Sequence, residues 1–297
     1  MAQVKGELTH EVLRLLDRLS YQPSLRALSL HAGRHDSRRV GSSTEFREFR
    51  EFRKEDGLKA IDWKASARSQ RKLVREKEHQ GRFDHWMLVD SSGSMLYPDG
   101  PTSKFRRQLL ICGALMYLFN GQGDRIAACS SQEGQPVKME PSRGSRALDE
   151  RIGWLADLQP SGQTITPDLI QNLSKTLRGT GVVWAFTDLD GEPEPLLQAF
   201  SNFGHMGFEV NVIHLYHPHE KDLPFSGPFV MEDLESWRSD VDLNPENLSD
   251  AYRELWIKER EDFRSRIETQ GHRFHSLDIT ESPESWITSI FSRKSRG

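Results

Sequence analysis

Cysteine is almost absent from this 297-residue chain, and long apolar runs are missing. Its two cysteines, Cys112 and Cys129, cannot build a disulfide framework and are too few for a structural zinc site, which favours a reducing compartment. The longest apolar run, residues 109–119, is well short of the roughly 20 residues that a membrane helix needs. The first residues are polar, and the apolar segment of a secretory leader does not follow them. We therefore expect a cytoplasmic protein without membrane insertion.

A strong excess of one charge is also missing. The chain has 40 Lys+Arg and 44 Asp+Glu, a net charge of −4, which gives no overall attraction to nucleic acid or to an anionic membrane. Residues 1–83 carry 19 basic and 12 acidic side chains, whereas the remainder carries 21 and 32. The basic residues alternate with acids, so they do not form one positive face. We predict a basic N-terminal extension, residues 1–79, that packs on an acidic domain, residues 80–297, and no nucleic-acid partner.

From residue 84 onward, short apolar segments alternate with amphipathic ones. We expect strands at residues 85–90, 124–131, 181–188, 209–216 and 273–279. We expect helices at residues 103–120, 145–158, 167–177, 195–203, 248–270 and 283–293, and a long irregular excursion over residues 217–245. Strands separated by helices predict an α/β fold: a Rossmann-like, doubly wound and mostly parallel sheet.

Oxygen-bearing side chains stand where two of these strands end. Asp90, Ser92 and Ser94 occupy alternate positions after the first strand, and Asp188 ends the strand at 181–188. Thr164 lies in a turn directly before an expected helix. Ligands of doubly wound sheets bind beyond the carboxyl ends of the strands, and hard dications prefer compact oxygen ligands from tight loops. The spacing therefore predicts a divalent-metal site.

This arrangement resembles the von Willebrand factor A fold with its metal-ion-dependent adhesion site. The pattern of that site is Asp-x-Ser-x-Ser after the first strand, a Thr in a Gly-x-Thr turn and an Asp after a central strand. The matching residues are Asp90, Ser92, Ser94, Thr164 and Asp188.

The chain is still more similar to the family called domain of unknown function fifty-eight. The likeness covers roughly residues 30–290 and is carried by EFREFR at 45–50, IDWKASAR at 61–68, LVRE at 73–76 and GDRI at 123–126. The block at 61–68, followed by DSSGSM at 90–95, is its most specific part.

The resemblance implies metal-dependent protein binding without catalysis. Asp90, Ser92, Ser94, Thr164 and Asp188 would hold Mg²⁺, with Mn²⁺ as the alternative ion, and a partner protein would complete the shell with a Glu or Asp carboxylate. Proteins resembling this family are often encoded beside MoxR-type AAA+ ATPases. The resemblance thus implies an adaptor that works with such an ATPase in protein maturation or complex assembly.

Several alternatives stay open. Thr166 rivals Thr164 as a ligand, and Asp190 rivals Asp188. A metal-dependent hydrolase would need a general base, for which Asp190 or Asp168 is the obvious candidate. A scaffold with a vestigial metal site would bind through the charged helix at 248–270.

Two further groups of residues receive ordinary structural interpretations. We expect His214, His217 and His219 to be solvated loop histidines rather than a zinc site, because no cysteine stands near them. Trp63, in the 61–68 block, is expected to be a core or seam residue, because large aromatic side chains mostly supply buried area.

Overall fold

The computed structural model describes residues 10–21, 23, 45–51, 66, 71, 73–78, 83–132, 135–160, 177, 181–222, 229–231, 241–243 and 249–292. The chain divides into two compact units, which we call the sheet unit, Met1–His31 with Phe83–Gly297, and the hairpin unit, Ala32–Arg82. The predicted extension is thus divided, since its first 31 residues group with the sheet unit. Packing of an extension on the acidic domain stays a prediction.

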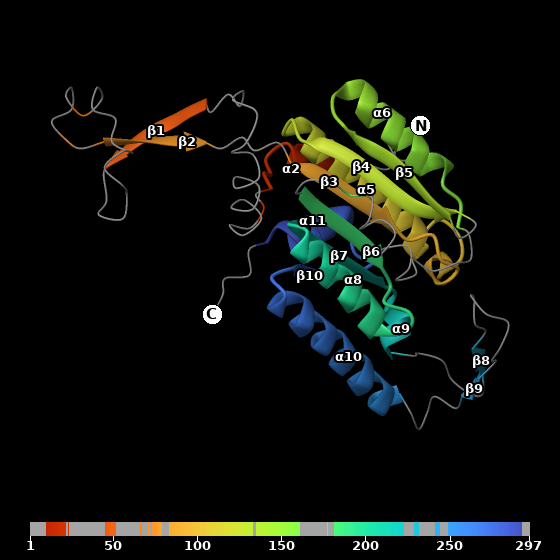
Figure 1. The fold of residues 1–297 in the computed structure, drawn as a ribbon. Coiled ribbons are helices and arrows are strands. Elements are labelled where there is room, and N and C mark those ends of the chain that lie inside the picture. The colour runs from red at the N-terminus through yellow and green to blue at the C-terminus, as the bar shows by residue number, and fades with distance from the viewer. Residues whose placement is uncertain are drawn as a thin grey trace. The chain divides into compact units, whose positions relative to one another are not determined.

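A six-stranded sheet lies at the centre of the sheet unit, in the order β10-β7-β6-β3-β4-β5 (Figure 1). Its strands are β3 Asp84–Val89, β4 Arg125–Gln132, β5 Gln135–Ser142, β6 Gly181–Thr187, β7 Phe208–Tyr216 and β10 Arg273–Asp278. Neighbouring strands are parallel except for β4 and β5, which are antiparallel. The predicted fold class, an α/β doubly wound and mostly parallel sheet, is confirmed, as are the five predicted strands.

Helices cover both faces of the sheet, and the alternation along β3 shows how. The helices concerned are α2 His10–Leu16, α5 Lys104–Gly121, α6 Ser145–Asp157, α8 Pro193–His205, α10 Ser249–Thr269 and α11 Pro283–Phe291. Met87 and Val89 belong to one apolar cluster with residues of α2, α5, α6 and α11, whereas Trp86 and Leu88 belong to another with residues of α8 and α10. Successive strand side chains point to opposite faces, so a strand that is buried along its whole length reads as a continuous apolar run.

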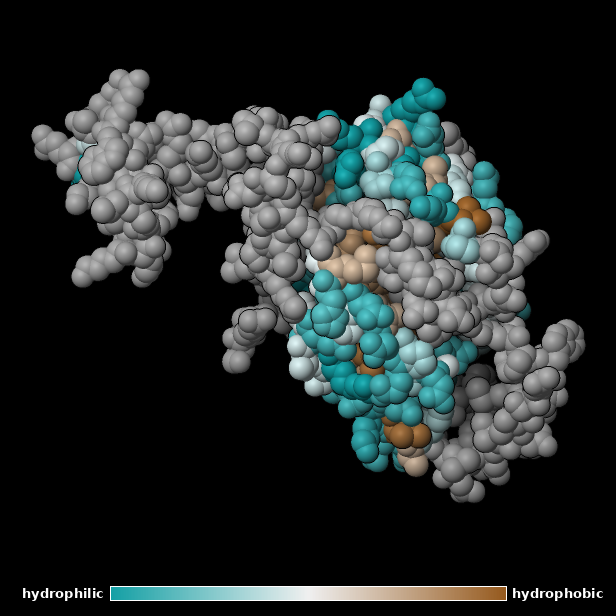
Figure 2. Space-filling model, in the orientation of Figure 1, coloured by the Kyte–Doolittle hydropathy of each residue, from teal (hydrophilic) through white to brown (hydrophobic). Residues whose placement is uncertain are grey.

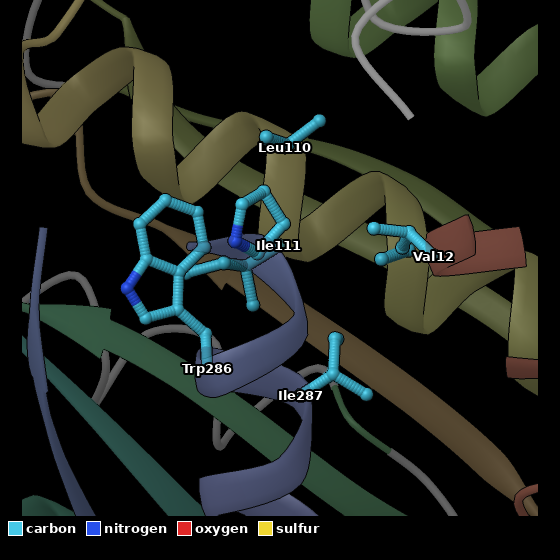
Figure 3. Close-up of a pocket in the computed structure, with 7 residues that line it drawn as sticks. Val12, Leu110, Ile111, Trp286 and Ile287 are labelled. Carbon is cyan, nitrogen blue, oxygen red and sulfur yellow. The ribbon is translucent and has the colours of Figure 1, made fainter. Parts of the chain in front are cut away.

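A short N-terminal helix, α2 (His10–Leu16), belongs to the sheet unit and was not expected from the sequence. Its Val12 and Leu16 are fully buried in the first cluster. Figure 3 shows a small pocket lined by Val12, by Leu110 and Ile111 of α5, and by Trp286 and Ile287 of α11. The side chains that line this small pocket are apolar, so we interpret it as part of the core.

Strand β5 was not predicted, and it contains Pro136 and Pro141, which are uncommon inside strands. The structure places β5 at the edge of the sheet, where a proline is tolerated since one side of the strand needs no partner. The predicted excursion over 217–245 contains a short helix, α9 (Pro218–Asp222), and an antiparallel pair, β8 (Phe229–Met231) with β9 (Val241–Leu243).

The hairpin unit contains two antiparallel strands, β1 (Glu45–Glu51) and β2 (Leu73–Glu78). Trp63 and most of the 61–68 block lie outside the described residues.

In the sheet unit, α10 has a mostly hydrophilic surface (Figure 2). Leu255 and Ile257 are its exposed apolar exceptions. Within the described ranges, no helix is both long and apolar enough to span a bilayer.

Candidate metal site

The loop after β3 turns its polar side chains toward one another. Asp90 and Ser92 are fully buried, and Ser94 is 9% exposed. The Ser92 amide donates to Asp90 Oδ1 at 2.9 Å, which holds the carboxylate over the turn. The hydroxyl oxygens of Ser92 and Ser94 lie 3.0 Å apart. Three of the five predicted ligands therefore gather at the carboxyl end of β3.

Gln108, one turn into α5, fixes the backbone of this loop. Its Oε1 accepts a hydrogen bond from the Asp90 amide at 3.2 Å, and its Nε2 donates to the Asp90 carbonyl. Gln108 is fully buried. Ser91 belongs to the same loop but faces β4, because its hydroxyl donates to the Ser131 carbonyl at 2.7 Å.

Asp188 reaches the same point from the end of β6, the strand next to β3. It is 6% exposed and hydrogen-bonded to Ser94, whereas Asp190 is exposed. The intervening Leu189 has φ of 57°, a left-handed conformation that costs a leucine energy and that the surrounding contacts must therefore stabilise. The geometry thus favours Asp188 over Asp190 as a ligand. Thr164, Thr166 and Asp168 lie outside the described residues.

The ammonium group of Lys104, which was not predicted from the sequence, lies beside Asp188. Lys104, the first residue of α5, is 1% exposed, and its Nζ lies 2.8 Å from Asp188 Oδ2 and 2.5 Å from Glu220 Oε1 of α9. Burial alone would lower the pKa of Lys104, but the charges of Asp188 and Glu220 outweigh it and raise that pKa. Burial would likewise raise the pKa of Asp188, but the charge and hydrogen bond of Lys104 hold that pKa below its usual value. Lys104 and Asp188 are therefore both charged at neutral pH.

Residues of α9 and of the loop before α5 form a rim beside these groups. Glu220 Oε2 accepts from the His217 amide at 2.6 Å, and the Tyr97 hydroxyl lies 3.2 Å from His219 Nδ1. Leu96, next to Tyr97, is 41% exposed. We call Leu96, Tyr97, His217 and His219 the rim; it combines an apolar side chain with polar aromatic ones.

The expectation of three solvated histidines is wrong for His214. This residue lies in β7 rather than in a loop and is fully buried, with Nδ1 2.9 Å from the Ser276 hydroxyl. Burial, aided by the charge of Arg260, lowers the pKa of His214 to about 3. His219 is exposed and His217 is partly exposed.

The donors present suit a small hard dication. Serine hydroxyls and carboxylates are the oxygen ligands that Mg²⁺ and Mn²⁺ accept. In the described part of the chain, no group of three or more His, Cys, Asp or Glu side chains could hold a metal ion. A centre built mainly from carboxylates or histidines therefore has no basis in those residues, and a metal there would need hydroxyl ligands as well as carboxylates. Asp90, Ser92, Ser94 and Asp188 would hold it, with Lys104 as a competing cation.

The sequence did contain a signal for Lys104. A basic residue in the first turn of a helix opposes the helix dipole, so a lysine directly after the N-cap Ser103 is locally unfavourable. When such a residue is also buried, as Lys104 is, it needs a carboxylate partner from elsewhere. Gln108 follows one turn later, on the same side of the helix. Glu220 could not be found this way, because its relation to the site depends on how α9 returns to the sheet.

Several solved structures are similar in fold. BatB from Bacteroides thetaiotaomicron has a TM-score of 0.46 and 13% identity, over 70% of this chain and 95% of that one. An aerotolerance-related membrane protein from Bacteroides fragilis has a TM-score of 0.47 and 15% identity, over 70% of this chain and 98% of that one. The SpRpn10 VWA domain has a TM-score of 0.37 and 14% identity, over 45% of this chain and 75% of that one.

Curated relatives include the uncharacterized proteins Mb1516 of Mycobacterium bovis and Rv1480 of Mycobacterium tuberculosis. Each is 23% identical over 202 residues, which is 66% of this chain and 62% of the relative. The chain thus matches less than two thirds of the length of these relatives. The family described as protein of unknown function DUF58 matches residues 48–262. This match spans well over half of the sequence, and the chain belongs to the DUF58 family.

Proposed function

We propose that this protein is a metal-dependent protein-binding module. Asp90, Ser92, Ser94, Thr164 and Asp188 would hold Mg²⁺ or Mn²⁺, and the partner would contribute a Glu or Asp carboxylate. The observation that supports this most is the convergence of two strand ends. The Ser92 and Ser94 hydroxyls lie 3.0 Å apart after β3, and Ser94 is hydrogen-bonded to Asp188 after β6.

The chemistry of these donors favours binding of an anionic partner. When bound, the metal would supply a positive charge that neutral hydroxyls leave incompletely neutralised. A carboxylate from outside is then attracted, and a buried charged contact of this kind dominates the affinity of an interface. The rim places the exposed Leu96 and the aromatic Tyr97 beside the site. We infer a partner segment that carries an acidic residue next to an apolar one.

A hydrolase is the less favoured alternative. Its general base would have to lie near the metal with a pKa close to neutral. Asp190 is exposed and accepts a hydrogen bond from the Gly191 amide at 3.1 Å, while Glu220 is already paired with Lys104. We propose that the site binds without turnover.

The cellular role is a proposal that rests on the family resemblance. We propose an adaptor that binds a MoxR-type AAA+ ATPase or its client during protein maturation or complex assembly, in the cytoplasm and without nucleic acid. The charged α10 would serve the alternative, metal-independent scaffold.

The test compares Ser92→Ala with Ser91→Ala. The two serines are adjacent and buried, but only Ser92 faces Ser94, whereas Ser91 bonds to Ser131. The full chain is used to capture a purified MoxR-type ATPase in Mg²⁺ and in EDTA, and Mn²⁺ affinity is measured by calorimetry. We expect Ser92→Ala to weaken Mn²⁺ binding by about tenfold or more and to abolish Mg²⁺-dependent capture, with Ser91→Ala close to the wild type. Equal Mn²⁺ affinities for both variants, or capture that survives EDTA, would contradict the proposal.

A further inference from the structure

Lys104 is a cation that the fold places inside the candidate site. It begins α5, where the helix dipole disfavours positive charge, and it is almost fully buried, which is rare for lysine. Both disadvantages are offset by two carboxylates from distant parts of the chain. Asp188 follows β6, and Glu220 belongs to α9. The two carboxylates stabilise the buried lysine, because a buried ammonium without any carboxylate partner would be strongly unfavourable.

This ammonium shares a carboxylate with the predicted metal. Asp188 Oδ2 accepts from Lys104 at 2.8 Å, and the same carboxylate is hydrogen-bonded to Ser94, another predicted ligand. A dication held by Ser94 and Asp188 would therefore approach Lys104 closely. Like charges a few ångströms apart in a buried site repel strongly. The dication and the Lys104–Asp188 contact accordingly oppose each other.

We propose that Lys104 is a tethered cation that competes with the divalent metal for Asp188, and that Glu220 keeps the ammonium when the metal takes Asp188. The proposal rests on the metal site of the proposed function and adds its regulation. The 2.5 Å contact between Lys104 and Glu220 provides the second position, so the ammonium need not become an unpaired buried charge.

The second position links the metal to the rim. Glu220 Oε2 also accepts from the His217 amide, and the Glu220 carbonyl accepts from the Tyr252 hydroxyl of α10 at 2.9 Å. When Lys104 loses its contact with Asp188 and keeps only Glu220, its interaction with α9 therefore changes. By linkage, a partner that binds the rim and shifts α9 would change the metal affinity in the same measure.

The experiment separates two effects on metal affinity: competition by the Lys104 ammonium and the net charge of the site. Asp90, Asp188, Glu220 and Lys104 carry three negative charges and one positive one, a formal −2. Lys104→Met makes this −3, whereas the double variant Lys104→Met/Glu220→Gln has only two carboxylates and is again −2. Lys104→Arg keeps the cation. The affinity of each full-length protein for Mn²⁺ alone is measured by calorimetry, and thermal unfolding in EDTA checks that each variant folds.

We expect the double variant to bind Mn²⁺ about tenfold or more tightly than the wild type at equal formal charge, and Lys104→Arg to bind no more tightly than the wild type. Equal or weaker binding by the double variant would overturn the proposal, as would tighter binding by Lys104→Met that the double variant does not share. If the double variant binds Mn²⁺ and the wild type does not, the competition is supported, but the proposed function of the native chain fails. If no variant binds Mn²⁺, both fail.

Discussion

The two ends of strand β3 are both polar and buried, yet they are built differently. At its beginning, Trp184 Nε1 donates to His85 Nδ1 at 3.1 Å, so the His85 proton is on Nε2, which donates to Asp124 Oδ2 at 3.2 Å. Asp124 Oδ1 accepts from the Phe83 amide at 3.0 Å. At its end, Asp90, Ser92 and Ser94 present hydroxyls and a carboxylate, with Lys104 as the only cation paired with Asp188 by a described contact.

The difference lies in the balance of donors and acceptors. The beginning of β3 is closed, because each donor named there has its acceptor, and His85 stacks on Phe119 with ring centroids 3.7 Å apart. Such a network contributes to stability and leaves little for a ligand. The end of β3 brings two carboxylates and two hydroxyls together, with one ammonium group, Lys104, paired with Asp188. Polarity and burial are therefore common to both ends, and the excess of carboxylates over cations distinguishes the end of β3 from its beginning.

The largest effect on stability that would test this comparison is expected at the beginning of β3. Asp124→Ala leaves the Phe83 amide and the His85 Nε2 proton without their acceptor in a buried place, so we expect a loss of about 3 kcal/mol of unfolding free energy. Urea denaturation measures it. Mn²⁺ affinity, measured by calorimetry, should not change. A stable variant with altered Mn²⁺ affinity would show that the two ends do not have separate roles.

A smaller effect is expected from pH, through His214. Its folded-state pKa of about 3 lies below the ordinary value near 6.5. Between these two values, His214 is protonated in the unfolded chain but not in the folded one. The stabilising contribution is complete above about pH 6.5 and is lost as the pH falls toward 3. Between pH 7 and pH 5 this amounts to about 2 kcal/mol.

Denaturation of wild type and His214→Asn at both pH values isolates that term. The wild type should lose about 2 kcal/mol more than the variant over this interval, since asparagine does not titrate. Equal losses in the two proteins would mean that His214 takes up its proton in the folded state as readily as in the unfolded one.

The smallest effect is expected for Ser91→Ala, at the end of β3. This variant loses the buried hydrogen bond to the Ser131 carbonyl, for which we expect a cost of about 1 kcal/mol in thermal or urea unfolding. Ser92→Ala, whose hydroxyl faces Ser94 rather than β4, should cost no more in the absence of metal. A Ser92→Ala protein that unfolds far more easily than Ser91→Ala would indicate a structural role for Ser92.

Much of this fold could be predicted from the sequence, because strands buried on both faces are rich in apolar and β-branched or aromatic residues. The residues of β3, β6 and β7 are nearly all buried, and each was expected within one residue of its observed bounds. Strand β5 was missed because an edge strand tolerates the prolines that normally argue against one. Helix α2 was missed because its burial depends on α5 and α11, far along the chain.

The candidate site was predictable to the extent that it is local. Asp90, Ser92 and Ser94 lie in one turn, and Asp188 lies beside them because parallel strands end at the same edge of a sheet. The Lys104 contacts span 84 residues to Asp188 and 116 to Glu220, and the second depends on where α9 returns. Local pattern indicates which residue is locally disfavoured, but only the tertiary fold shows which carboxylates neutralise it.

A crystal of the full-length protein soaked in Mn²⁺ and measured for anomalous scattering tests the central claim most directly. We predict a peak bounded by the oxygens of Ser92, Ser94 and either Asp90 or Asp188, at about 2.1–2.2 Å from the nearest of them. An anomalous map without a peak at the end of β3, at a Mn²⁺ concentration that saturates the protein in calorimetry, would contradict the account.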